Sequence, residues 1–183
     1  AASGRWLPLC SSFNFDSIQP TTRHRFSALG ITPPTARQLT AISPIIRRLP
    51  QDGDDPRWSF ARETLVVDSP PGSGKTLSYL LPIADLALRS TTMTAAIAAP
   101  SEMFAAQVHD LAVDLLGADR VELLTSPATM MNQNASVFIG ELETLTQLPS
   151  RVLANLRCLV IDDAVQFLMP ASKYSPASLR KEW

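Results

Sequence analysis

The chain has 183 residues, about one domain's worth, and with 45% hydrophobic and 18% charged residues it is expected to be globular rather than disordered. A net charge of −1 contrasts with the strongly basic balance of most free-standing nucleic-acid-binding domains. Two cysteines, Cys10 and Cys158, exclude a disulfide framework, and no apolar stretch reaches the roughly 20 residues of a membrane span. We therefore expect no membrane partner.

Residues 1–20 are predicted to be an N-terminal extension, and residues 21–183 to form one domain. The first fifteen residues carry a single charge, Arg5, together with several serines and alanines. This composition resembles the end of an organelle transit peptide, which makes the mitochondrion the expected compartment. An ordinary N-terminal extension, in the cytoplasm or nucleus, is the alternative.

Helices are predicted before the first strand. Thr21 or Thr22 can cap a helix over residues 23–29, because a threonine hydroxyl accepts a hydrogen bond from the first helical turn. Thr35 can cap a second helix over residues 36–49 in the same way.

Short apolar strands then alternate with helices, which is typical of βαβ units and of a parallel sheet covered on both faces. The predicted fold class is therefore α/β, with helices flanking a mostly parallel sheet, and ligands bind such sheets at the carboxyl ends of the strands. The predicted order is a strand at 65–67, a helix at 76–90, a strand at 95–99, a helix that is capped by Ser101, runs to residue 116 and is closed by Gly117, strands at 121–124 and 137–139, a helix at 141–148 and a strand at 159–161.

The segment Ser-Pro-Pro-Gly-Ser-Gly-Lys-Thr, residues 69–76, lies between a predicted strand and a predicted helix. Phosphate binding requires successive backbone N–H groups that point inward, and glycines permit this tight path. A helix N-terminus adds partial positive charge, Lys75 can reach the β- and γ-phosphates, and the Thr76 hydroxyl can ligate Mg²⁺. The predicted nucleotide contacts of this P-loop are Pro71, Gly72, Ser73, Gly74, Lys75 and Thr76.

A P-loop alone also fits kinases and GTPases, and three further segments narrow the choice. Residues 30–38, Gly-Ile-Thr-Pro-Pro-Thr-Ala-Arg-Gln, are similar to the Q motif of DEAD-box RNA helicases. Residues 74–83 resemble the helix that follows the P-loop in that family, including its proline. Residues 159–165, Leu-Val-Ile-Asp-Asp-Ala-Val, fall where the family has its Walker B strand and Asp-Glu-Ala-Asp.

This resemblance spans residues 13–169 and implies the first RecA-like lobe of such a helicase, with ATP and Mg²⁺ as cofactors. It further implies that Gln38 reads the adenine edge and that Phe13 stacks on adenine. Asp162 matches the carboxylate that organises Mg²⁺. The chain ends before the family's Ser-Ala-Thr motif and its second lobe.

The Walker B segment departs from the family pattern. Asp163 stands where a glutamate positions and deprotonates the attacking water, and its side chain is one methylene shorter. A displacement of about 1 Å can cost on the order of 10²-fold in rate. Val165 replaces the last aspartate and can bind no ion. The candidate catalytic residues are Lys75, Asp162 and Asp163.

The motifs that face RNA in the family differ more. Glu102 stands where the family has an arginine, and Glu141 and Glu143 lie near the position of a second arginine. Acidic side chains repel an RNA backbone and release no counterions.

The favoured hypothesis is a helicase-like domain that binds ATP, with weak or lost ATPase activity. Its expected partners are RNA or a ribonucleoprotein, as in ribosome assembly or RNA processing, and neighbouring proteins. An active ATP-dependent RNA helicase seen as its first lobe is one alternative. A different P-loop NTPase is another, although the sequence has no Asn-Lys-x-Asp guanine motif.

Overall fold

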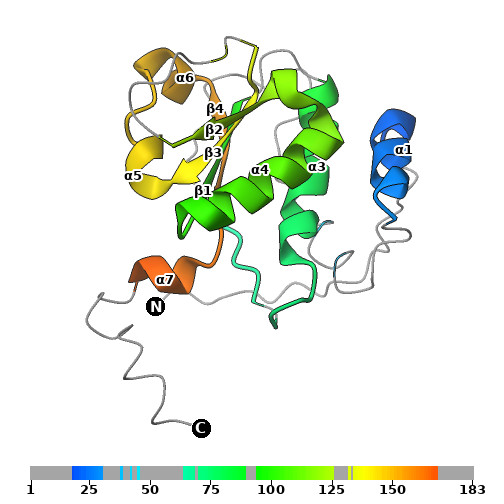
Figure 1. Cartoon of the computed structure of the whole chain (residues 1–183), viewed down its shortest axis with the longest axis horizontal. Helices are drawn as coiled ribbons and strands as arrows, with labels where there is room; N and C mark the ends of the chain where they lie inside the picture. Colours follow the sequence, from blue (N-terminus) through cyan, green and yellow to red (C-terminus); the bar gives the residue numbers. More distant parts are fainter. Residues whose placement is uncertain are drawn as a thin grey trace, which may run out of the picture. The chain divides into compact units, whose positions relative to one another are not determined.

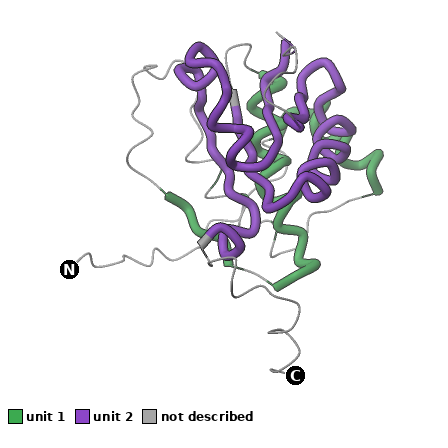
Figure 2. The backbone as a smooth tube through the Cα atoms, turned by 60° about the vertical axis from the view of Figure 1, so that its left-hand side comes forward, with its two compact units in different colours: residues 1–91 green, residues 92–183 purple. Residues whose placement is uncertain are grey.

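The computed structural model describes residues 18–30, 38, 42, 45, 64–68, 70–89, 94–125, 132 and 134–168. The chain divides into two compact units, Ala1–Thr91 and Thr92–Trp183, which are coloured separately in Figure 2. Figure 1 labels the helices and strands of both units. Among the helices of the described ranges, none has both the length and the apolar character needed to cross a membrane.

The first unit contains helix α1, Pro20–Ala28. Its N-cap is Gln19, and Pro20 occupies the first helical position, where the missing N–H costs no hydrogen bond. The prediction that Thr21 or Thr22 caps this helix is therefore wrong. Thr22 lies inside the first turn and is fully buried.

The second long helix of this unit is α3, Lys75–Arg89. It begins directly after the glycine loop and contains Pro82, as predicted. Nearly every residue in its middle is buried, so this helix forms the core of the first unit. Its buried residues are Ser78, Tyr79, Leu80, Leu81, Pro82, Ile83, Ala84, Asp85, Leu86 and Ala87.

Asp85 is a buried carboxylate that joins α3 to the start of α1. Its side chain accepts hydrogen bonds from the Gln19 backbone N–H at 2.8 Å and from the Thr22 hydroxyl at 3.1 Å. Arg89, one turn along α3, forms an ion pair with the same carboxylate. A buried charge is tolerated only when it is paired and hydrogen-bonded, and Asp85 meets both conditions.

The strand predicted at residues 65–67 is not present. This segment has no regular secondary structure, and Val66 is 82% exposed. An apolar run of three residues becomes a strand only where it gains ladder hydrogen bonds and burial, and this segment shows neither. Of the helix predicted over residues 36–49, Gln38, Ile42 and Ile45 are helical, and the rest lies outside the described residues.

The second unit is built on a four-stranded parallel sheet with the strand order β2-β3-β1-β4. Ile97 of β1 lies opposite Ile139 of β3 and Val160 of β4. The predicted parallel sheet and these four strands are confirmed. Their bounds are Thr94–Ala99 for β1, Val121–Leu124 for β2, Val137–Glu141 for β3 and Leu156–Ile161 for β4.

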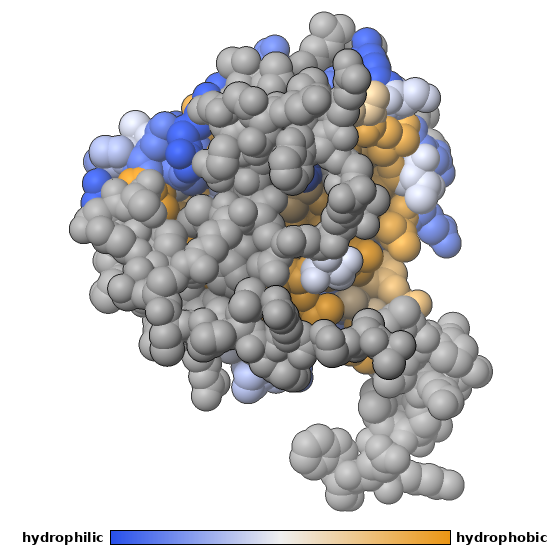
Figure 3. Space-filling view, turned by 180° about the vertical axis from the view of Figure 1, so that it is seen from behind, coloured by the Kyte–Doolittle hydropathy of each residue, from blue (hydrophilic) through white to orange (hydrophobic). Residues whose placement is uncertain are grey.

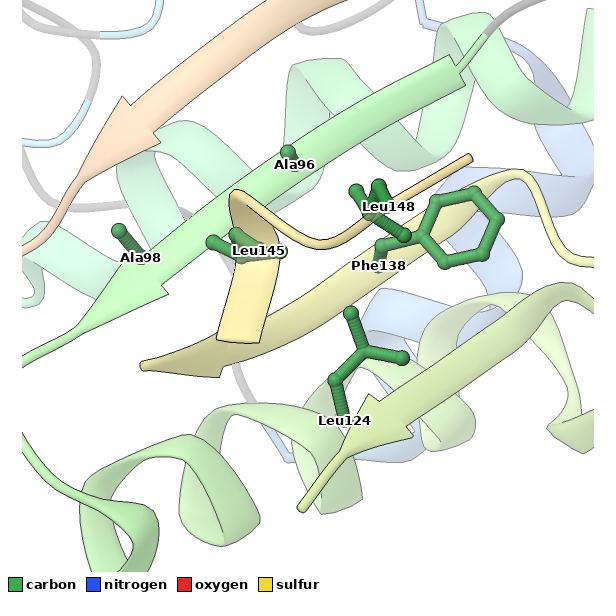
Figure 4. Packing of buried hydrophobic residues seen from close by; sticks show 6 residues of the cluster. All are labelled: Ala96, Ala98, Leu124, Phe138, Leu145 and Leu148. Carbon is green, nitrogen blue, oxygen red and sulfur yellow. The ribbon is translucent and has the colours of Figure 1, made fainter. Parts of the chain in front are cut away.

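Helices cover both faces of this sheet. Helix α4, Glu102–Leu116, contacts β1, β2 and β3, and it is capped by Ser101 and ends at Gly117 as predicted. On the other face a cluster of buried residues packs beneath helix α5, Leu142–Leu145, as Figure 4 shows. The cluster comprises Ala96, Ala98, Leu124, Phe138, Leu145 and Leu148. The short elements that complete the unit are η2, Ala118–Arg120, α6, Ser150–Ala154, and α7, Ala164–Leu168.

The single helix predicted over residues 141–148 is wrong in extent. Glu141 is the last residue of β3, and α5 is a single turn, with α6 following after Pro149. Gly140 permits this geometry, because a Cβ there would lie 2.9 Å from both the Leu124 carbonyl oxygen and Thr144 Oγ1. The turn after β3 therefore packs closely on β2, which fixes the positions of Glu141 and Leu142.

Replacing Asp85 with alanine should lower the free energy of unfolding by about 1–3 kcal/mol, because it leaves the buried Thr22 hydroxyl and the part-buried Gln19 N–H without their acceptor. The measurement is urea unfolding followed by circular dichroism. Asp110→Ala, on an exposed face of α4, is the matched control and should cost less than about 0.5 kcal/mol. Equal costs for the two variants would contradict the role given to Asp85.

Burial raises the pKa of the Cys158 thiol to about 11. In a Cys10→Ser background, alkylation of the folded chain by iodoacetamide should therefore be slow at pH 8 and rise with a midpoint near pH 11. The same chain in urea should show a midpoint near that of a free thiol, about 8.5. Because the unfolded chain loses this proton first, stability should fall as the pH rises between the two midpoints. A folded-state midpoint near 8.5 would refute the shift.

Candidate functional site

The glycine loop of the first unit forms a tight turn, as its sequence predicts. Gly72 and Gly74 have φ angles of 72° and 84°, in the left-handed region that glycine adopts without cost. The Ser73 N–H donates to the Pro70 carbonyl oxygen at 3.3 Å, which closes the turn. The loop is thus folded back on itself immediately before α3.

The first residues of α3 face this turn. The Lys75 ammonium donates to the Pro70 carbonyl oxygen at 3.2 Å, so a lysine and a backbone N–H converge on the same oxygen atom. A phosphate oxygen carries negative charge and is a stronger acceptor than a peptide carbonyl. The N-terminus of α3 adds partial positive charge at the same place. These groups fit a phosphate.

Gln38 lies against the loop, as the Q-motif resemblance implies. The side chain is only 5% exposed, and a Cβ on Gly74 would lie 2.9 Å from Gln38 Cδ and closer still to Nε2. Two features therefore require glycine at position 74: its positive φ angle and the Gln38 amide, which leaves no room for a Cβ. The structure brings Gln38 and the P-loop together, whereas Phe13 and Ser69 lie outside the described residues.

The two aspartates of the second unit follow β4. The Asp162 N–H donates to the Ala98 carbonyl oxygen at 2.9 Å, which extends the β4–β1 pairing by one residue. Asp163 has a φ of 51°, a left-handed conformation that is uncommon for a residue with a side chain. The Gln166 side-chain amide donates to the Asp163 carboxylate. Asp163 is thus held in a turn before α7 by a neighbour that the sequence analysis did not single out.

The acidic residues predicted to replace RNA-facing arginines lie at the carboxyl ends of β1 and β3. One Glu141 carboxylate oxygen accepts a hydrogen bond from the Glu102 backbone N–H at 3.1 Å. The side chains of Glu102, Glu141 and Glu143 are all exposed. This edge of the sheet therefore presents negative charge.

Asp85 is a second polar residue whose role the sequence did not indicate. Aspartate four residues before arginine within a helix is a common surface pair, and this spacing alone did not indicate burial. One feature of the sequence could have indicated that Asp85 is buried: the neighbouring residues in the middle of its helix are mostly apolar or small.

Residues 36–174, more than half of the chain, match the family model described as DEAD/DEAH box helicase. The chain belongs to the DEAD/DEAH box helicase family. The matched residues include the P-loop and the Walker B segment, and this membership argues against a kinase or a GTPase.

Curated relatives agree with this family. The chain is 30% identical over 121 residues to DEAD-box ATP-dependent RNA helicase 55 of Arabidopsis thaliana, a match that covers 59% of this chain and 26% of the relative. It is 32% identical over 123 residues to ATP-dependent rRNA helicase spb4 of Schizosaccharomyces pombe, a match that covers 55% of this chain and 20% of the relative. The aligned region thus spans about a quarter or less of these relatives.

Solved structures show the same fold. A DEAD box protein of Methanococcus jannaschii superposes with a TM-score of 0.63 and 20% identity, covering 86% of this chain and 42% of that one. S. cerevisiae Dbp5 bound to Gle1 and IP6 superposes with a TM-score of 0.66 and 19% identity, covering 86% of this chain and 40% of that one. The fold is that of a RecA-like helicase lobe.

Replacing Gly74 with alanine should destabilise the first unit by about 1–3 kcal/mol, because it adds backbone strain and a clash with Gln38. It should also weaken the binding of a fluorescent ATP analogue, measured by titration. Adding Gln38→Ala should relieve the clash but not the strain.

Gly117→Ala is the matched control, since Gly117 has a φ of 96° in the second unit. It should cost stability without changing nucleotide affinity. If Gly74→Ala bound nucleotide as tightly as the Gly117 control, the loop would not be the nucleotide site.

Proposed function

We propose that the chain is the first RecA-like lobe of a DEAD-box RNA helicase-like protein that binds ATP with Mg²⁺ and hydrolyses it weakly or not at all. The convergence of Lys75 and the Ser73 N–H on one oxygen supports triphosphate binding, and Gln38 beside Gly74 supports selection of adenine. Bound Mg²⁺ would neutralise phosphate charge. Thr76 and Asp162 are the ligands proposed for it, from the family pattern.

The conformation of Asp163 carries the proposal of weak turnover. At the glutamate position of the family pattern, a general base must reach the attacking water within hydrogen-bond distance. Asp163 is one methylene shorter than glutamate, and its carboxylate accepts the Gln166 amide instead. The shorter side chain and the hydrogen bond from Gln166 both keep the Asp163 carboxylate away from the position that the carboxylate of a glutamate would reach.

An active helicase is the second candidate, and the groups that support nucleotide binding are compatible with it as well. The loop glycines, Lys75 and Gln38 retain the arrangement that nucleotide binding requires. Catalysis would then depend on Asp163 moving away from Gln166 when nucleotide binds.

We further propose that this protein works inside an RNA–protein assembly, in ribosome assembly or RNA processing. The name of the S. pombe relative, an rRNA helicase, supports the first of these. The composition of residues 1–15 supports a mitochondrial location. Imaging of the tagged natural protein tests that location, and exclusion from mitochondria would reject it.

The binding proposal predicts that Lys75→Ala weakens ATP binding in the presence of Mg²⁺ by about 10- to 100-fold, which corresponds to a lost charge-assisted hydrogen bond. Isothermal titration of the natural full-length protein measures this. Arg151→Ala, an exposed cation on α6, is the control and should bind as the wild type does. Failure of the wild type to bind would leave only a scaffold role.

The same preparation tests turnover with RNA present. Asp163→Glu combined with Val165→Asp should raise ATP hydrolysis by about tenfold or more. The glutamate side chain is long enough to reach the attacking water, and the aspartate at position 165 restores the last acid of the family motif. Val165→Asp alone should change little. Wild-type turnover at the rate of an ordinary DEAD-box helicase would favour the second candidate instead.

A further inference from the structure

Three large apolar side chains are exposed together at the carboxyl edge of the second unit's sheet. Met103 and Phe104, in the first turn of α4, are 64% and 44% exposed, and Leu142, the first residue of α5, is 36% exposed. The two helices begin at the same edge, because Ala99 of β1 pairs with Glu141 of β3. With their acidic neighbours, these residues form what we call the α4–α5 surface: Glu102, Met103, Phe104, Glu141, Leu142 and Glu143.

Other large apolar residues are exposed on β4 and on the helix that follows it. Leu159, Ile161 and Val165 lie on β4 and α7, and Figure 3 shows further apolar surface in orange. Nothing in the structure indicates what covers that surface. The α4–α5 surface differs because a hydrogen bond joins the starts of its two helices and its acidic residues continue along α4.

The N-terminus of α4 already holds an anion. The Glu141 carboxylate accepts the Glu102 N–H at 3.1 Å, at the end of a helix whose dipole favours negative charge. An external phosphate would have to displace this carboxylate and then lie beside Glu102 and Glu143. The hydrogen bond also joins the start of α4 to the start of α5, so the backbone that carries the three apolar side chains is already ordered.

The charge of this part of the chain is strongly negative. Between Ser90 and Ser150 the sequence has seven acidic residues and a single lysine or arginine, Arg120, which gives a net charge of −6. Arg120 precedes β2 and so lies at the opposite, amino edge of the sheet. The seven acidic residues are Glu102, Asp110, Asp114, Asp119, Glu122, Glu141 and Glu143.

The negative charge continues from the α4–α5 surface along α4. Met103, Gln107, Asp110 and Asp114 are exposed and follow the spacing of one helix face. His109 on the same helix is paired with the Asp110 carboxylate at 3.4 Å. An elongated ligand seated on Met103 would therefore meet carboxylates along its length. A polyanion would be repelled there, and a cationic helix attracted.

We propose that the α4–α5 surface binds a basic amphipathic segment of a protein partner. The apolar residues of that segment would pack on Met103, Phe104 and Leu142, and its lysines or arginines would face Glu102, Glu143 and the acids of α4. The inference deepens the proposed function, since it names a surface for the neighbouring proteins of the assembly, but it does not require nucleotide binding.

The test is fluorescence anisotropy with the full chain and three synthetic peptides. The first is an amphipathic helix of leucine and lysine, the second has the same composition in scrambled order, and the third has glutamate in place of lysine. Only the first should bind. Its affinity should fall with added salt, as expected for complementary charges.

Variants locate the binding. Phe104→Ser with Leu142→Ser should weaken binding of the first peptide by about tenfold or more, since buried aromatic anchors carry much of an interface's energy. Leu153→Ser, at a residue of α6 that is 40% exposed, is the matched control and should leave binding unchanged. Glu102→Gln with Glu143→Gln should flatten the salt dependence.

Several results would overturn the proposal. These are equal binding of the scrambled peptide, equal loss in the Leu153→Ser control, and displacement of the peptide by oligouridine, which would make the surface an RNA site. Concentration-dependent dimers that disappear in the Phe104→Ser, Leu142→Ser variant would make the occupant a second copy. Lys75→Ala should leave peptide binding intact, so failure of nucleotide binding and failure of this inference are separate outcomes.

Discussion

Parallel pairing of β1 with both β3 and β4 is the constraint on which the second unit depends. Because the strands run in the same direction, their carboxyl ends meet at one edge. That edge carries Ser101 and Glu102 after β1, Glu141 at the end of β3, and Asp162 and Asp163 after β4. Segments far apart in the chain thus become neighbours, and any activity of this unit is set by the side chains at those few positions.

The first unit is organised by a different interaction, the buried carboxylate of Asp85. It fixes α1 to α3 through Gln19, Thr22 and Arg89. Helix α3 also begins at the P-loop, where Gln38 packs against Gly74. One helix therefore carries the P-loop at its start and the anchor of α1 farther along.

The chain has the fold of its family, and the carboxyl edge of its sheet carries several acidic side chains. The four strands, the P-loop turn and the helix that follows it retain the family's architecture. At the sheet edge, Glu102, Glu141 and Glu143 are exposed acids, and exposed apolar residues lie beside them. A sheet edge tolerates such changes because its loops contribute little to the core, whereas the packed faces around Ala96 and Phe138 do not. A chain can therefore keep this fold while the side chains at its sheet edge vary.

The sequence alone determined the features that depend on neighbouring residues. The glycine turn, the start of α3, the Ser101 cap and Gly117 end of α4, and four short strands all follow from local backbone preferences and apolar spacing. Family resemblance added Gln38, which no local rule would have placed beside the loop. Phe13 and the separation of residues 1–20 from the domain stay predictions.

Tertiary structure decided what depends on distant partners. Asp85 meets Gln19 across 66 residues, and Glu141 meets the Glu102 N–H across 39, so neither contact could be read from spacing. Whether residues 65–67 become a strand depends on ladder partners and burial that the run itself does not encode. Local preferences act over a single turn or strand, whereas burial and hydrogen-bond partners are assigned only when the chain has folded, which is why the sequence indicated the elements and the structure determined their contacts.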